Sequence, residues 1–133
     1  MSEIKVDTLT GKTTAGDITV TSEGGAATMQ LQQGLAKMWV NFNGTGTIAS
    51  RDSLSISSLD DNGTGDYTLN FSNNMGNASY SVVCGGILNR QVSTSRLEGT
   101  NVRTTTQCQV YSSNSGTLTD FPYMEFAIHG DLS

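Results

Sequence analysis

The stretch KMWVNFNGTG at residues 37–46 decides the class of fold. Its apolar residues alternate, so Met38, Val40 and Phe42 fall on one face of an extended chain and Trp39 falls on the other. An Asn-Gly pair follows directly, and these two residue types favour the positive φ angles of a tight turn. The stretch therefore predicts a half-buried β-strand that ends at a turn.

The same two-residue period returns through the rest of the chain. Asn-Gly-Thr-Gly occurs again at residues 62–65, where it predicts a hairpin turn. Apolar residues alternate in five further segments: Leu54 and Ile56; Tyr67, Leu69 and Phe71; Tyr80, Val82 and Cys84; residues 101–111; and Met124, Phe126 and Ile128. We therefore predict an all-β fold, an antiparallel β-sandwich (jelly-roll-like) of roughly six to eight short strands.

The first part of the chain has a different composition. All nine aromatic residues lie from Trp39 onward, every Lys lies within the first 37 residues, and every Arg comes later. A segment without aromatic residues cannot build a core by itself. We therefore predict an extended N-terminal arm over residues 1–34, used for assembly or anchoring, and a β-sandwich head domain over residues 35–133. Residues 29–35 fit either a short helix or the last extended piece of the arm.

Composition also excludes several classes of protein. The net charge is −5 and the seven cationic residues are scattered, so we expect no binding to nucleic acid. The chain shows no signal peptide and no apolar run near the roughly 20 residues that span a bilayer, so we expect no membrane insertion. An apolar fraction of 35% is low, which indicates that part of the chain lies outside the core or that other copies complete it. Cys84 and Cys108 are expected to be buried free thiols.

The sequence contains few residues arranged for catalysis. His129 is the single histidine, and an exposed position near a strand edge explains it, so no His-based nucleophile or zinc cluster is expected. Gly11-Lys12-Thr13 lacks the earlier glycine of a phosphate-binding loop. The sequence therefore predicts no catalytic residue and no cofactor, and the protein is not expected to be an enzyme.

One polar turn could hold a metal ion. Its oxygen-bearing residues fall at alternate positions, as in the first half of a calcium loop: Asp60, Asn62, Thr64 and Asp66. Phe71 stands where such a loop has its bidentate Glu. A hairpin turn held by side-chain hydrogen bonds is the favoured interpretation, and calcium binding is the weaker alternative.

Three aromatic residues are candidates for an interface or for receptor binding. Trp39 and Tyr123 are expected opposite the apolar stripe of their strands, and Phe121 closes a Ser/Asn/Gly-rich loop over residues 112–120. Exposed aromatic residues mark either a protein interface or a platform for sugars. A subunit interface is the preferred interpretation in a chain short of apolar residues.

Five segments form a recognisable set: residues 2–9, residues 34–46, Arg51-Asp52-Ser53, residues 61–67 and residues 77–82. Together they resemble small tail-fibre-like virion structural proteins of marine tailed bacteriophages. The resemblance covers residues 1 to about 85 and, loosely, the ending at residues 128–131. The resemblance implies a homotrimer with an extended N-terminal part and a compact β-rich C-terminal part. These motifs are structural, so no functional residue follows from them.

The leading hypothesis is a non-enzymatic virion protein, assembled in the host cytoplasm. It would be a short trimeric tail fibre or fibre tip whose arm contacts other virion proteins. Loops over residues 86–100 and 112–122 would contact a bacterial surface receptor.

Two alternatives remain open at this point. The first is a capsid decoration or knob protein that stabilises the shell, which the location of copies on the virion would distinguish. The second is a tailspike-type polysaccharide hydrolase, against which the short chain argues. Such a hydrolase needs two carboxylates held across a groove, and no such pair is visible in the sequence.

Overall fold

A computed structural model describes residues 3–15, 17–85, 90–93 and 102–133. The chain divides into two compact units, Met1–Leu35 and Ala36–Ser133, which are described separately. Within the described residues, no helix is both long enough and apolar enough to cross a membrane.

Unit 1 contains a small hairpin and one helical turn. Strands β1 (Thr19–Thr21) and β2 (Thr28–Gln30) pair antiparallel, with Val20 opposite Met29. The helix α1 (Leu31–Gly34) follows β2 directly, so both structures considered for residues 29–35 occur in succession. No described residue of unit 1 is buried.

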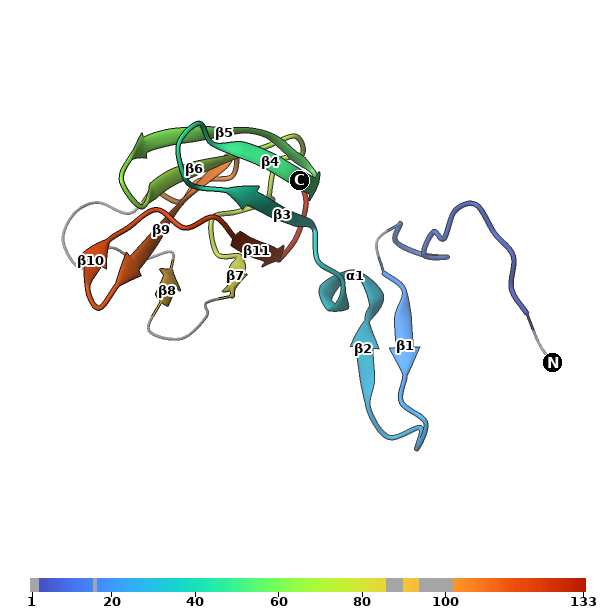
Figure 1. The fold of residues 1–133 in the computed structure, drawn as a ribbon. Coiled ribbons are helices and arrows are strands. Elements are labelled where there is room, and N and C mark those ends of the chain that lie inside the picture. Colours follow the sequence, from blue (N-terminus) through green and yellow to red (C-terminus); the bar gives the residue numbers. More distant parts are fainter. Residues whose placement is uncertain (1–2, 16, 86–89, 94–101) are drawn as a thin grey trace. The chain divides into compact units, whose positions relative to one another are not determined.

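Unit 2 is an antiparallel β-sandwich, as the two-residue period predicts (Figure 1). One sheet has the strand order β4-β3-β11-β7. Its strands are β3 (Met38–Asn43), β4 (Ala49–Leu54), β7 (Ser81–Cys84) and β11 (Met124–His129). In the other sheet β9 pairs with β6, β8 and β10, and β6 pairs with β5. Its strands are β5 (Ile56–Gly63), β6 (Asp66–Phe71), β8 (Arg90–Ser93), β9 (Gln107–Asn114) and β10 (Thr117–Leu118).

The core lies between the two sheets and uses the predicted apolar stripes. Met38, Val40 and Phe42 of β3 are all at most 2% exposed, while the residues between them are half-buried. The ring of Phe42 meets the edge of Tyr67 at 5.2 Å between centroids and stacks on Phe126 at 6.2 Å. Aromatic contacts of this geometry stabilise beyond the area that they bury. The inward-facing side chains of β3 therefore form part of the core that holds the two sheets together.

Ser55 corrects one predicted strand. Leu54 and Ile56 were expected on one face of a single strand, but Ser55 has φ 57 and separates β4 from β5, which lie in different sheets. Leu54 is consequently 46% exposed on the outside of one sheet, whereas Ile56 packs against the core from the other. The left-handed backbone conformation of Ser55 turns the chain, so the in-and-out alternation of side chains in β5 is independent of that in β4.

The predicted long strand over residues 101–111 is also wrong. Residue 101 lies outside the described residues, and β9 begins only at Gln107. Before it the chain folds back: Gln109 N–H donates to Val102 O at 2.8 Å, and Thr104 N–H donates to Gln107 O at 3.0 Å. Thr104 Oγ1 also accepts from the Gln107 N–H at 3.1 Å. The side chain of Thr104 thus closes a turn within residues 102–109, and the alternating sequence pattern did not indicate this turn.

Candidate binding face on the four-stranded sheet

The outer face of the four-stranded sheet presents an apolar row that crosses every strand. The strand register places Leu54 of β4 opposite Trp39 of β3, Trp39 opposite Ala127 of β11, and Ala127 opposite Val83 of β7. Val83 is 57% exposed, and Trp39 and Ala127 are half-buried. The row therefore offers apolar surface at the outside of the sandwich.

A polar network runs beside this row. Asn41 Nδ2 donates to Glu125 Oε1 at 2.7 Å, and Arg51 Nη1 donates to Asn41 Oδ1 at 3.2 Å. The Arg51 guanidinium also donates to Pro122 O and lies 4.4 Å from the centre of the Tyr123 ring. The Asn41 amide therefore holds the Glu125 carboxylate, and the Arg51 guanidinium holds the Asn41 amide. The network links side chains of β3, β4 and β11 with the loop before β11.

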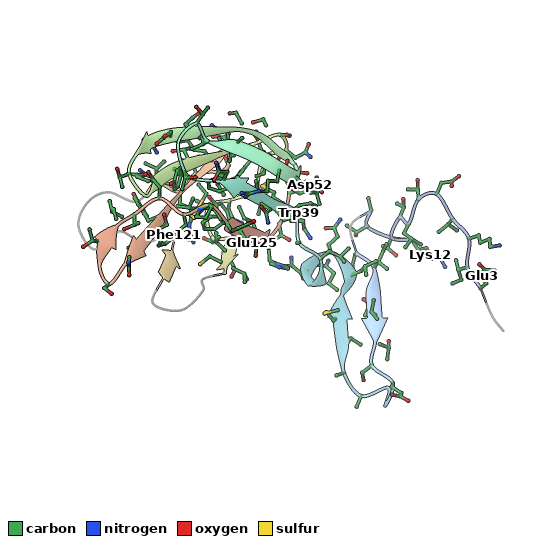
Figure 2. The ribbon with its side chains drawn as sticks, in the orientation of Figure 1. Glu3, Lys12, Trp39, Asp52, Phe121 and Glu125 are labelled. Carbon is green, nitrogen blue, oxygen red and sulfur yellow. The ribbon has the colours of Figure 1, made fainter. Side chains whose placement is uncertain are left out.

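A β-bulge explains why Arg51 can join this network. Opposite β3, Asn41 pairs with Asp52 and Phe42 pairs with Ser50, so Arg51 is the extra residue of β4. A bulge inserts one unpaired residue and redirects its side chain. Figure 2 shows Asp52, Trp39 and Glu125 on the neighbouring strands β4, β3 and β11 of this sheet.

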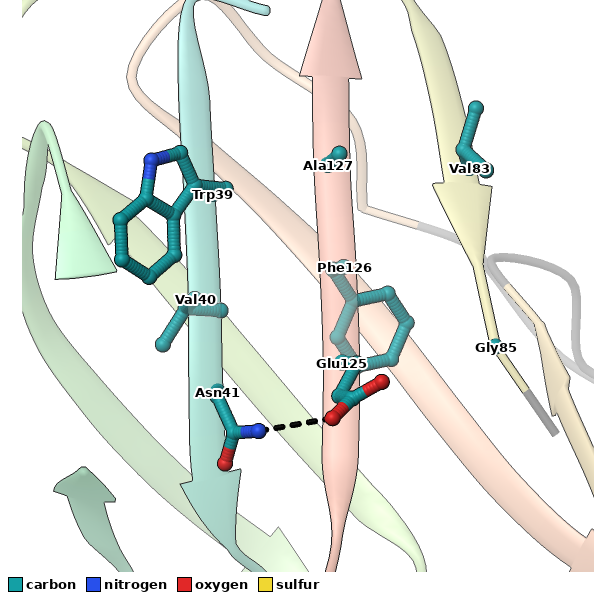
Figure 3. Close-up of a pocket in the computed structure, with 8 residues that line it drawn as sticks. All are labelled: Trp39, Val40, Asn41, Val83, Gly85, Glu125, Phe126 and Ala127. Atoms are coloured by element: carbon teal, nitrogen blue, oxygen red, sulfur yellow. Dashed lines mark hydrogen bonds between the residues drawn. The ribbon is translucent and has the colours of Figure 1, made fainter. Parts of the chain in front are cut away.

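Between β3 and β7 the face is hollowed over β11 (Figure 3). The hollow has a volume of about 370 Å³ and an open mouth. Short residues lie at its centre and far edge, Ala127 and Gly85, while Trp39 and Val83 border it on opposite strands. Asn41 and Glu125 close one end, joined by their hydrogen bond.

One oxygen of Glu125 is available in this hollow. Oε1 accepts from Asn41, and Oε2 has no hydrogen-bond partner in the part of the chain that the structure describes. Oε2 faces Gly85, since a Cβ added at Gly85 would lie 3.7 Å from it. The carboxylate is therefore held in place by one oxygen and can accept hydrogen bonds from a ligand with the other.

The described lining of the hollow supports binding more than acid–base catalysis. Glu125 is its one carboxylic acid, whereas glycoside hydrolysis uses a pair. Apolar walls with a few fixed polar groups are the usual composition of a ligand site.

The three aromatic residues predicted to form an interface or receptor site lie in different places. Trp39 and Tyr123 lie on this face, and Tyr123 is 63% exposed. Phe121 does not: it is 5% exposed and belongs to the core, because the Gly44 N–H donates to Phe121 O at 2.9 Å and draws the loop inward. Phe121 is therefore a core residue rather than a surface for a partner.

The candidate calcium residues form a hydrogen-bonded turn. Asn62 Nδ2 donates to Asp66 Oδ1 at 3.2 Å, and Gln109 Nε2 donates to the same oxygen at 2.7 Å. Asp60 instead accepts from Asn70 Nδ2 at 2.8 Å, and Thr64 lies in the exposed turn after β5. The structure thus brings Asn62 and Asp66 together and directs Asp60 to another partner.

The remaining reactive residues do not line the hollow. His129 was expected at an exposed strand edge, but it ends β11, which lies between β3 and β7, and it is half-buried. The thiols of Cys84 and Cys108 are not joined in a disulfide, and burial raises the pKa of both. Burial thus disfavours the thiolate, which is the form that reacts as a nucleophile.

The sequence did not single out Asn41, Arg51, Glu125 and Ala127 as binding residues. The alternation that places Trp39 outward also places Asn41 outward, and the alternation over residues 123–129 places Glu125 and Ala127 opposite the core, so that signal was present. The bulge at Arg51 and the register of β11 against β3 depend on pairing between distant segments, which a single sequence does not display. Comparisons of the chain with protein-family models, with curated proteins and with solved structures find no significant match.

Proposed function

We propose that the chain is a non-enzymatic structural subunit of a bacteriophage virion, a short trimeric tail fibre or fibre tip that helps attach the particle to its host. One observation carries the proposal: the described residues of unit 1 bury no side chain, although they include several large apolar ones. A segment that buries so little does not offset its own ordering entropy. A partner must therefore supply its order.

The apolar residues of unit 1 are spread along its length. The exposed ones are Ile4 (84%), Val6 (56%), Leu9 (59%), Val20 (43%), Met29 (52%) and Leu35 (55%). Burying each of them would contribute about 1.5–3 kcal/mol. Val20 and Met29 face each other across the hairpin, and a lone two-stranded hairpin is marginally stable in water. Association of arms from sister chains would cover these residues and stabilise the hairpin.

Unit 2 supports the complementary role of a head. Its core is formed by residues 38–128 of the unit itself, and among the described residues no buried side-chain polar atom is without a partner. A self-sufficient sandwich can present a surface while the arm assembles. The resemblance to tail-fibre-like proteins supports the virion as the place of assembly.

Light scattering of the purified full chain and of a chain that begins at Ala36 tests the proposal. We expect a trimer for the full chain and a monomer with an unchanged melting temperature for the shorter one. Val20→Asp should dissociate the full chain, whereas Thr21→Asp, one residue along the same strand, should not. A monomeric full chain whose unit 1 amides resist hydrogen exchange would contradict the proposal. If copies of the chain are found on the capsid shell instead of the tail, the tail-fibre proposal is replaced by that of a capsid decoration protein.

A further inference from the structure

We propose that the hollow over Ala127 binds a neutral saccharide, and that Glu125 Oε2 is its principal hydrogen-bond acceptor. The inference rests on the proposed function in host attachment, because the saccharide is the chemical class that we assign to the receptor on the host surface. It assigns this contact to the four-stranded sheet instead of the predicted loops over residues 86–100 and 112–122. Residues 86–89 and 94–100 lie outside the described residues, and the rest of these segments contains β8, the end of β9 and β10.

The shape of the hollow suits a single sugar ring. Ala127 and Gly85 are short, and Trp39 of β3 and Val83 of β7 line the hollow on either side of β11 (Figure 3). A pyranose has an apolar face of C–H groups and a rim of hydroxyls. Its C–H face can rest on the Ala127 methyl group between β3 and β7, while one hydroxyl of its rim donates to Glu125 Oε2 and the others stay hydrated.

The polar end supplies a fixed acceptor. Glu125 Oε1 is held at 2.7 Å by Asn41, and Asn41 is held in turn by Arg51. Oε2 is thereby oriented without a bound ligand, which lowers the ordering cost of binding. A carboxylate accepts strong hydrogen bonds from hydroxyl groups.

Charge favours a neutral ligand over an acidic one. Glu125 is the single charged residue among those that line the described hollow, and Asp52 adds a second carboxylate on the neighbouring β4. Arg51 carries a positive charge beside this face, and its described contacts are with Asn41, Pro122 O and the Tyr123 ring. A neutral sugar meets no like charge at Glu125, whereas the carboxylate of an anionic sugar would approach the Glu125 carboxylate directly.

A second copy of the chain fits this face less well. A stable protein interface buries about 800 Å² on each partner, from roughly 20 or more residues. The apolar row has four residues, and charged side chains border it at Arg51 and Glu125. A protein partner that covered Glu125 Oε2 without a donor would also leave a desolvated carboxylate.

Trp39 is the only tryptophan of the chain, so its fluorescence reports on this site alone. The full-length protein is titrated with methyl α-glucopyranoside, methyl α-mannopyranoside and methyl β-galactopyranoside, and with methyl glucuronide as the anionic probe. We expect a saturable change of Trp39 emission with at least one neutral glycoside and none with the glucuronide.

Variants then test the two contacts. Glu125→Gln keeps an amide partner for Asn41 but removes the free acceptor, and we expect binding at least about tenfold weaker. Ala127→Leu fills the hollow and should abolish binding. Matched controls are Glu23→Gln in unit 1 and Ala49→Leu at the exposed start of β4, and both should bind like the parent chain.

The outcomes separate this inference from the proposed function. The saccharide site is overturned if no neutral glycoside changes the Trp39 emission. It is also overturned if Glu125→Gln and Ala127→Leu both bind as tightly as the parent chain. A lower molecular mass of Ala127→Leu in light scattering also overturns it, in favour of a contact between copies. A trimer that binds none of the sugars refutes the saccharide site alone, and a monomer that binds one refutes the trimeric assembly alone.

Discussion

The hydroxyl of Tyr67 offers a sharp test of what holds the sandwich together. Tyr67 is 0% exposed, and its hydroxyl donates to Asp120 Oδ1 at 2.7 Å. Gly44 O lies 2.9 Å from the same hydroxyl, and the Gly65 N–H donates to Asp120 Oδ1 at 2.6 Å. Burial and the Asp120 carboxylate raise the pKa of Tyr67, so the hydroxyl stays protonated and donates. Asp120 thereby ties the turn after β5 to the loop that follows β10.

Tyr67→Phe removes this hydroxyl and keeps the ring. The edge contact with Phe42, 5.2 Å between centroids, should survive. A hydrogen bond to a charged acceptor contributes about 1.5–3 kcal/mol, so the free energy of unfolding should fall by about 2 kcal/mol. In a domain of this size each 1 kcal/mol shifts the melting temperature by about 4–8 °C, which gives a loss of about 8–16 °C.

Urea denaturation followed by circular dichroism measures the change. Tyr123→Phe is the matched control, because Tyr123 is 63% exposed, and it should change stability by less than about 0.5 kcal/mol. The double variant with Asp120→Asn closes a mutant cycle, in which we expect a coupling of at least about 1 kcal/mol. A loss below about 0.5 kcal/mol for Tyr67→Phe, or additive effects in the cycle, would refute the link through Asp120.

Other variants and conditions test further features of the structure. Ser55→Gly should stabilise the sandwich by up to about 1 kcal/mol in thermal melts, because it relieves the φ of 57; a loss of stability would contradict a strained junction. Burial raises the pKa of Tyr67 and Tyr80, so both stay protonated when folded, and stability should fall as pH rises above about 10, where unfolded tyrosine ionises. A flat profile to strongly alkaline pH would count against this. Mass spectrometry after maleimide treatment should show half-buried Cys84 modified slowly and buried Cys108 modified only after unfolding; fast labelling of Cys108 in the native protein would show that the core opens.

Strands with an uninterrupted two-residue period were predictable from the sequence. Met38, Val40 and Phe42 are buried as expected, and so are Met124, Phe126 and Ile128 on β11. Each of these strands buries one face on the core, so the pattern of side chains reports the burial directly.

Predictions failed where the backbone leaves the β region or where a side chain closes a turn. Ser55 adopts a positive φ although serine has no special preference for it, and Thr104 closes a turn inside an apparent alternation. Both residue types are also common in strands and loops of this chain, in which Gly, Ser, Thr and Asn make up 59 of the 133 residues. Their local hydrogen bonds compete with strand pairing in a way that the period does not reveal.

The order of residues along the chain is enough to predict that the protein is all-β, that its core faces come from alternating apolar residues, and that the first segment lacks a core of its own. Each of these properties can be read from residues close together in sequence. The composition of the candidate face follows from the tertiary structure alone, because Asn41, Arg51 and Glu125 meet through the pairing of β4, β3 and β11. Register between distant strands depends on bulges and on which residues finally pair, and folding sets both across more than eighty residues of separation between Asn41 and Glu125.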